Sequence, residues 1–350
     1  MSESSNITTI NQTWKTESGF DFPSVEIAWK SWGTLNEHKD NVILICHALT
    51  GNSNAEDWFS GLFDPEGIID TEQHFVLCIN NLGSCYGTTG PTSINPASGK
   101  SYQGNFPRIS IRDIVRHQQL LLDHLEIKGI ELAIGGSMGG MVALEFGLSD
   151  KRIKSLALMA MGKSHSPWAI GISHAQRQAI YADQHWNDGF YDPAFPPQQG
   201  LAAARALAMI TYRSAQNYEQ KFGRALHESS SKFEVESYLE YQGQKLADRF
   251  DANTYIRLTE AMDTHDVSRD RGSFLEVLQS LRLPCLVLGI DSDLLYPKNE
   301  QIELAALIPN AEFKEIKSTH GHDAFLLEFE QINHHLKSFY NSTLQSYEYH

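Results

Sequence analysis

Residues 131–140 read Glu-Leu-Ala-Ile-Gly-Gly-Ser-Met-Gly-Gly, so an apolar run leads directly into a glycine-rich turn with Ser137 at its centre. Residues 141–147 continue with helical spacing. A G-x-S-x-G between a strand and a helix is typical of a nucleophile elbow, a sharp turn that exposes the serine hydroxyl. Glycines two positions to either side leave room for so tight a bend. The pattern predicts that Ser137 is a catalytic nucleophile.

Two other interpretations of this turn are a phosphate-binding loop and a glycine-rich connection without chemistry. A phosphate loop has the pattern G-x-G-x-x-G or G-x-x-x-x-G-K-S/T. Residues 135–140 fit neither pattern well, and no lysine follows them. Because strand, motif and helix occur in the order that an elbow needs, we favour the elbow.

Short aliphatic runs and helix-like stretches alternate on both sides of the elbow. Such alternation is typical of a mostly parallel sheet with helices on both faces, and with the elbow it predicts the α/β-hydrolase fold. Residues 25–29 predict an earlier strand of an antiparallel start. The expected buried strands are 42–46, 75–80, 132–134, 156–159 and 286–290, and the expected helices between them include 111–125 and 139–148.

The alternation stops after about residue 162, and no convincing strand occurs from there to about residue 270. Helical spacing instead predicts helices over 175–186, 201–212 and 235–262. A chain of 350 residues suits two domains or one large α/β domain with an insertion. A helical block between two strands of the sheet is the usual form of a lid. The expected parts are a first core segment over 1–163, a helical lid insertion over 164–275, and a second core segment over 276–350.

The composition excludes several classes of function. The formal net charge of −15 argues against a nucleic-acid partner and against docking on an anionic membrane surface. No apolar run reaches the roughly eighteen residues of a membrane span, and the polar start has no secretory signal. The four cysteines have neither zinc nor disulfide spacing, so we interpret them as reduced core residues. We expect a cytoplasmic protein without a metal site.

An elbow serine needs a base and an orienting acid, which in this fold follow it in the order Asp or Glu, then His. The strand expected over 286–290 runs straight into Asp291-Ser292-Asp293, so both aspartates are candidate acids. A plain turn is the alternative, because such sequences often end strands. Chain order favours a catalytic acid here, and we favour Asp293.

The base is expected in a loop after the last strand. Residues 312–316 predict that strand, and the loop behind it contains both His320 and His322. Gly321 between them lets the loop turn toward the serine. Position alone favours His322 only slightly.

The negative charge that develops on the substrate oxygen needs two backbone N–H donors, the oxyanion hole. One is expected from Met138, the residue after the nucleophile, and the other from the loop behind the strand 42–46. We expect Leu49 to supply the second donor. His47 in the same loop precedes the elbow in the chain, so we interpret it as a structural histidine.

Four segments together resemble the homoserine O-acetyltransferase family, over roughly residues 18–339 and including the insertion. They are CHALTG at 46–51, GPTSINP at 90–96, GSMGGM at 136–141 and GHDAFL at 321–326. Each is moderately specific alone, and all four in order make a strong match. The resemblance implies transfer of an acetyl group from acetyl-CoA, a co-substrate and not a permanently bound cofactor, to the side-chain hydroxyl of L-homoserine. This reaction leads toward methionine.

The resemblance also selects among the candidate residues. The family acid lies in a pattern like S-D-x-L-F/Y-P and the family histidine in G-H-D, which implies Asp293 and His322. The arginine of a Y-R-S segment, here Arg213, is implied to hold the homoserine carboxylate, and Asp323 to face the amino group. A guanidinium fork matches a carboxylate bidentately. A surface ion pair for Arg213 and a loop cap for Asp323 are the alternatives.

The acyl group and the acceptor stay open within this resemblance. Relatives that transfer succinyl tend to carry an arginine two residues after the catalytic aspartate, where this chain has Leu295, so acetyl is favoured. Succinyl transfer, serine as the acceptor, and a serine esterase or thioesterase are the alternatives. The resemblance further implies a homodimer, which we expect to form through the helical lid.

Overall fold

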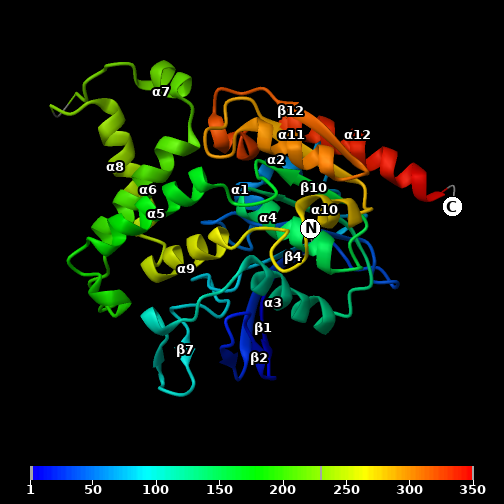
Figure 1. Ribbon diagram of the computed structural model, residues 1–350, viewed down its shortest axis with the longest axis horizontal. Coiled ribbons are helices and arrows are strands. Elements are labelled where there is room, and N and C mark those ends of the chain that lie inside the picture. Colours follow the sequence, from blue (N-terminus) through cyan, green and yellow to red (C-terminus); the bar gives the residue numbers. More distant parts are fainter. Residues whose placement is uncertain (1–2, 229–230, 349–350) are drawn as a thin grey trace.

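A single eight-stranded sheet forms the centre of the computed structural model, which describes residues 3–228 and 231–348 (Figure 1). The strand order is β1-β4-β6-β5-β9-β10-β11-β12. Pairing is antiparallel from β1 to β4 and from β4 to β6, and parallel from β6 onward, as predicted. The strands are β1 (Glu3–Ile10), β4 (Val25–Trp32), β5 (Val42–Cys46), β6 (Phe75–Ile79), β9 (Ile130–Gly136), β10 (Leu156–Met159), β11 (Cys285–Ile290) and β12 (Ala311–Ile316).

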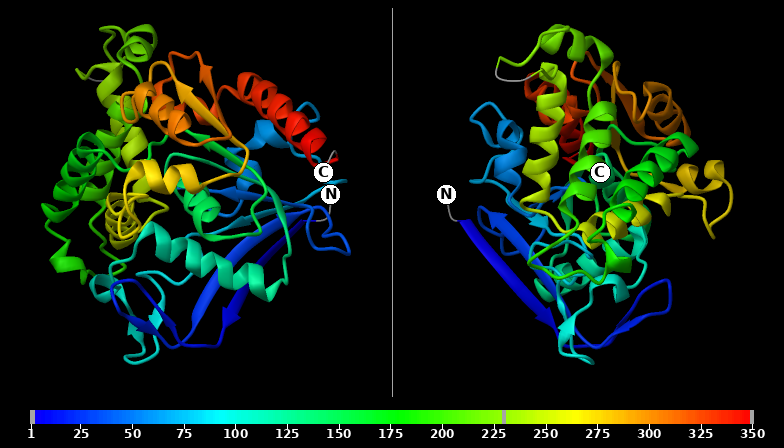
Figure 2. Two further views of the ribbon diagram at one scale, coloured as in Figure 1. Left: turned by 45° about the vertical axis from the view of Figure 1, so that its right-hand side comes forward. Right: turned by 90° about the vertical axis from the view of Figure 1, so that its left-hand side faces the viewer.

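Helices cover both faces of the sheet, so its central strands are apolar on both sides. In β5, Leu44 belongs to the core on one face, and Ile43 and Ile45 belong to the core on the other. Figure 2 shows the two helical layers on either side of the strands. The first layer contains α3 (Ile111–His124), α4 (Met138–Ser149), α10 (Phe274–Ser280) and α11 (Lys298–Leu307); the second contains α1 (Ala55–Trp58), α2 (Ser60–Phe63) and α12 (Phe329–Glu348).

A helical insertion separates β10 from β11 and stands to one side of the sheet, at the left of Figure 1. Its helices are α5 (Pro167–Tyr181), α6 (Gln198–Tyr212), α7 (Ala215–Phe222), α8 (Glu234–Ala247) and α9 (Ala252–Asp263). The prediction of one helix over 235–262 is wrong. The chain breaks after α8, and the Asp251 carboxylate accepts the N–H of Thr254 at 2.7 Å to begin α9 as a new helix.

The insertion leaves and rejoins the core at adjacent points, which we call the neck. Ser164 and Asp266 form an isolated β-bridge, and the N–H of His165 donates to the His265 carbonyl at 2.7 Å. The side chain of His165 contacts the hydroxyl of Tyr296 at 3.0 Å, close to the end of β11. The neck is therefore hydrogen-bonded to the core.

The first strand was not predicted, because its mixture of polar and apolar residues has no strong pattern. It forms the edge of the sheet by pairing along all of β4. The cysteines are free thiols, and Cys46, Cys78 and Cys285 are buried in strands as predicted. Among the described helices, none is both long and apolar enough to cross a membrane.

Candidate active site

The turn between β9 and α4 has the strained geometry of an elbow. Ser137 has φ 55° and ψ −127°, a conformation that non-glycine residues rarely adopt, and its N–H donates to the Met159 carbonyl at 2.9 Å. The neighbouring glycines are needed for space. A Cβ on Gly135 would lie 2.3 Å from the backbone of Gly139, and one on Gly139 would lie 2.0 Å from the Cys46 carbonyl oxygen. The serine is thereby held at the carboxyl edge of the sheet.

His322 and Asp293 form a buried pair at this same edge. Nδ1 of His322 lies 2.7 Å from Oδ2 of Asp293, and both side chains are almost completely buried. The other carboxylate oxygen accepts the N–H groups of Leu295 at 2.8 Å and Tyr296 at 2.9 Å. These bonds fix the carboxylate, so Nδ1 of the imidazole carries the hydrogen and Nε2 is left to accept a proton.

The two rival residues from the sequence lie in other surroundings. Oδ1 of Asp291 accepts the N–H of Ser318 at 3.0 Å, which ties two loops together. Nδ1 of His320 contacts the amide of Asn217 at 3.2 Å and Arg213 at 3.4 Å, toward the insertion. Neither rival joins the contact between His322 and Asp293.

Aromatic rings surround the imidazole. The ring centroids of Tyr212, Tyr296 and Phe325 lie 5.5, 5.3 and 5.4 Å from that of His322. Tyr212 comes from the insertion and the other two from the core, so both parts of the chain enclose the histidine. Such a shell excludes water and fixes the ring orientation.

A cavity of about 60 Å³ joins the predicted residues. Ser137 and His322 line it together, although they lie far apart in the chain. Leu49 and Asp323 also line it, whereas Leu295 does not. The full lining is Ala48, Leu49, Thr50, Ser137, Arg205, Tyr212, His322, Asp323, Phe325 and Leu326.

The peptide between Ala48 and Leu49 is held in a fixed orientation. Its carbonyl oxygen accepts the N–H of Gly51 at 2.9 Å and lies 2.9 Å from Nδ1 of His47. Because the peptide is planar and trans, the N–H of Leu49 points the opposite way. That N–H makes no hydrogen bond among residues 3–228 and 231–348. Met138 opens α4, so its N–H has no acceptor in its own helix.

His47 is a structural histidine, as predicted. Its Nε2 accepts the N–H of Asn81 at 3.0 Å, which leaves the hydrogen on Nδ1 for the Ala48 carbonyl. Burial lowers the pKa of His47 to about 4, so the ring is neutral at physiological pH. His47 thereby orients the turn over residues 48–51 from the side of the core, and it is not among the residues that line the cavity.

Arg213 and Asp323 form an ion pair beside the cavity, with Nε and Oδ2 3.1 Å apart. Burial raises the pKa of Asp323, although the charges of Arg213 and Arg205 oppose that rise. Only Asp323 of the pair lines the cavity; Arg213 directly follows the last residue of α6.

Arg205 is a cavity residue that was not predicted from the sequence. Its guanidinium carbon lies 5.3 Å from the ring centroid of Tyr212, and both side chains line the cavity from α6. The signal was present, because Arg205 and Tyr212 are seven positions apart and therefore share one face of a helix. Arg213, one position later, is already outside the helix, with an extended backbone (φ −118°, ψ 156°).

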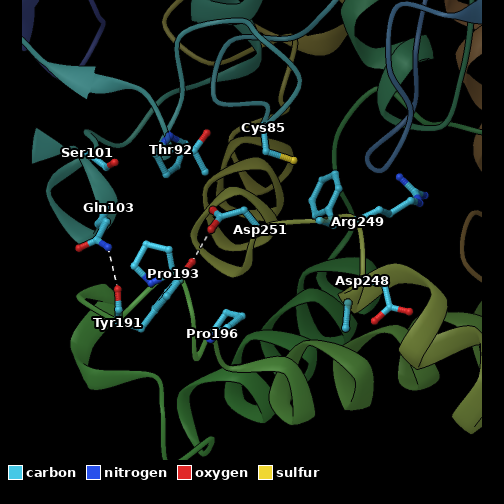
Figure 3. A pocket seen from close by; sticks show the side chains of 13 residues that line it. Cys85, Thr92, Ser101, Gln103, Tyr191, Pro193, Pro196, Asp248, Arg249 and Asp251 are labelled. Carbon is cyan, nitrogen blue, oxygen red and sulfur yellow. Dashed lines mark hydrogen bonds between the residues drawn. The ribbon is translucent and has the colours of Figure 1, made fainter.

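A larger cavity of about 420 Å³ lies under the junction of α8 and α9 (Figure 3). Its polar groups already serve the fold: Asp251 bonds the hydroxyl of Tyr191, and Gln103 donates to the Tyr191 carbonyl at 2.8 Å. The described residues that line it include Ser101 but no histidine, so its greater volume does not make it the better candidate for the catalytic site. On one side Arg249 separates it from the turn with Leu49.

Comparison with known proteins supports one family. A family model described as "alpha/beta hydrolase fold" matches residues 41–329. The homoserine O-acetyltransferase of Chlorobium chlorochromatii is 52% identical over 337 residues, 95% of this chain and 94% of that protein. That of Nostoc punctiforme is 52% identical over 91% of this chain and 90% of its own length.

Solved structures agree on the fold. The homoserine O-acetyltransferase of Bacillus anthracis superposes with a TM-score of 0.89 at 25% identity and covers 97% of each chain. Esterase E22 superposes with a TM-score of 0.88 at 24% identity, over 97% of this chain and all of its own, and this second likeness shows the fold alone. The predicted α/β-hydrolase fold is thus confirmed, and the chain belongs to the homoserine O-acetyltransferase family.

Proposed function

We propose that this protein transfers an acetyl group from acetyl-CoA to the side-chain hydroxyl of L-homoserine, as a cytoplasmic step toward methionine. The observation that carries the proposal is the cavity in which Ser137 and the His322–Asp293 pair meet Arg205 and Asp323. The first group is suited to activating a nucleophile, and the second to binding the carboxylate and ammonium of an amino acid. The names of the relatives supply the specific acceptor.

In the first half-reaction Ser137 becomes acetylated. As its Oγ attacks the thioester carbon, Nε2 of His322 takes the hydroxyl proton, and Asp293 stabilises the resulting imidazolium. The N–H groups of Leu49 and Met138 bind the negative oxygen, and each such donor contributes about 3 kcal/mol. The carbon–sulfur bond then breaks, and the thiolate of CoA leaves with the proton from His322.

In the second half-reaction the acetyl group moves to homoserine. His322 takes the proton of the substrate hydroxyl, and that oxygen attacks the acetyl carbon of the acyl-enzyme. The bond between this carbon and Oγ of Ser137 breaks, and the serine recovers its proton from His322. The aromatic shell around the imidazole limits competing attack by water.

The substrate's carboxylate is proposed to meet Arg205, and its ammonium Asp323. Arg205 lines the cavity, whereas Arg213, which the resemblance implies for the carboxylate, is paired with Asp323 and lies off the lining. We therefore assign Arg213 the task of holding Asp323. Leu295 lies off the lining too, so the preference for acetyl over succinyl rests on the relatives' names.

Replacing Arg205 with alanine is expected to raise KM for homoserine roughly 10- to 100-fold, the usual effect of losing a hydrogen bond to a charged group. Acetylation of Ser137 by acetyl-CoA alone should be little changed. Arg213→Ala, the matched variant, should raise KM less. Steady-state kinetics with varied homoserine make the comparison, and a larger effect in Arg213→Ala would return the carboxylate to that residue.

The overall activity is tested by analysing products with acetyl-CoA in the presence and absence of homoserine. We expect O-acetylhomoserine, with CoA release that depends strongly on homoserine. CoA release that ignores homoserine and yields acetate would instead identify a thioesterase. Parallel reactions with serine and with succinyl-CoA separate the other two alternatives.

A homodimer through the insertion is also proposed. The side chains of Leu207, Ile210 and Tyr241 on α6 and α8 are 39%, 50% and 62% exposed, which is unusual for apolar residues on adjacent helices. Light scattering should give twice the chain mass of 39.3 kDa for the native protein, and a lower mass for Ile210→Asp. A native monomer would contradict the proposal.

A further inference from the structure

We propose that Arg249 is a positioning residue: from the insertion, it holds the turn over residues 48–51 that presents the N–H of Leu49 to the oxyanion. The inference rests on the proposed function only in requiring that Ser137 is acylated with Leu49 as a donor. Arg249 is not among the residues that line the cavity with Ser137, so its role there would be indirect.

Within the part of the chain that the structure describes, side chains of the core hold the turn from its inner side. His47 fixes the Ala48 carbonyl from beneath, as described above. Further along, the amide oxygen of Asn80 accepts the N–H of Ser53 at 2.7 Å. Between these two anchors, Thr50 reaches the surface of the core with its carbonyl oxygen turned toward the insertion.

Arg249 supplies the anchor on the outer side. Its Nη1 donates to the Thr50 carbonyl at 3.0 Å and also to the hydroxyl of Tyr86. That hydroxyl in turn donates to the backbone carbonyl of Arg249 at 3.2 Å, and the ring of Tyr86 packs edge-on against Phe250. Tyr86 therefore binds both the backbone carbonyl and Nη1 of Arg249, and the same Nη1 reaches the Thr50 carbonyl. A donor oriented in this way can fix the acceptor it binds.

Because Arg249 belongs to the insertion, its contact with the Thr50 carbonyl links the insertion to the turn of the core. It lies in the break between α8 and α9, a part of the insertion that also borders the larger cavity (Figure 3). The insertion thus contributes side chains to the substrate cavity through α6 and holds the oxyanion turn through Arg249. A donor displaced by even about 1 Å loses much of its effect on the transition state.

The test compares Arg249→Ala with Arg257→Ala. Arg257 is a matched control because it also lies in the insertion and donates to a backbone carbonyl of the core, that of Gly104, at 3.0 Å. We expect Arg249→Ala to lower kcat for p-nitrophenyl acetate and for acetyl transfer by roughly tenfold or more, with KM for homoserine nearly unchanged. Arg257→Ala should leave kcat within about twofold of the native value even if both variants lose similar thermal stability.

Two further variants separate positioning from general loosening. Arg249→Lys retains a donor for Thr50 and should recover part of the lost kcat, whereas Tyr86→Phe should cause a smaller loss that does not add to that of Arg249→Ala. A boronic acid that mimics the tetrahedral intermediate should bind Arg249→Ala more weakly by about the factor lost in kcat. Equal losses of kcat in Arg249→Ala and Arg257→Ala, or unchanged boronate affinity, would overturn the inference. If the native protein forms no acetyl-Ser137 from either donor, the proposed function itself fails.

Discussion

Ser137→Ala is expected to lower kcat for acetyl transfer by about 10⁴-fold or more and to abolish the acyl-enzyme. Among the described residues that line the cavity with His322, only Thr50 and Tyr212 carry another hydroxyl. Neither of these two residues lies on a strained turn like that of Ser137, next to the backbone N–H groups of Leu49 and Met138. Mass spectrometry of the intact protein after exposure to acetyl-CoA measures the adduct directly.

A control for that experiment is Ser98→Ala, at an exposed serine in the connection between β7 (Ile94–Asn95) and β8 (Lys100–Ser101). This variant should keep both the adduct and the activity. Alanine at position 137 inherits the same positive φ as serine, so the fold should be equally stable in both proteins. Substantial transfer by Ser137→Ala would mean that the proposed nucleophile is wrong.

Asp293→Asn should lower kcat by about 10⁴-fold while the fold is retained, because the imidazole of His322 then carries its hydrogen on Nε2 and not on Nδ1. The N–H groups of Leu295 and Tyr296 require an oxygen in front of them, so the new amide nitrogen must face Nδ1 of His322. Nδ1 then has to accept a hydrogen bond, the hydrogen moves to Nε2, and the imidazole can no longer take a proton from Ser137. Steady-state kcat measurements make the test.

Asp291→Asn provides the matched comparison, since Asp291 lies two positions away and, among the described contacts, its carboxylate accepts a hydrogen bond only from the N–H of Ser318. Its kcat should stay within a few-fold of the native value. If Asp291→Asn proved as damaging as Asp293→Asn, the acid would have been assigned to the wrong side of the turn.

The sheet could be predicted from the sequence because its central strands are apolar on both faces, as in β5 and β11. The edge strand β1 has no such signature, and its pairing depends on β4. The break between α8 and α9 was overlooked because helical spacing continues on both sides of it. Asp251 followed by Thr254 was nevertheless a readable helix start.

In the candidate site, the sequence was informative where a local pattern dictates geometry. The elbow and the chain order predicted that Ser137 would meet an acid and a histidine, and the family resemblance selected Asp293 and His322 from the candidates. The structure brings Ser137 and His322 to one cavity, and His322 and Asp293 into one buried contact. The lining residues from the insertion, Arg205 and Tyr212, were harder to predict, because the side chains that reach the cavity depend on how α6 packs against the core. That packing places Arg205 on the lining and Arg213 beside Asp323.

The neck has an evolutionary consequence. Since Ser164 and Asp266 are bridge partners, the segment between them can be exchanged without altering the order or spacing of the strands that precede Ser137, Asp293 and His322. The inserted lobe is thus a replaceable module, and Arg205 and Tyr212 belong to it. Under the proposed function, changes in this lobe would alter the acceptor preference and leave the acylation residues of the core in place, provided that each new lobe again supplies a donor to the Thr50 carbonyl.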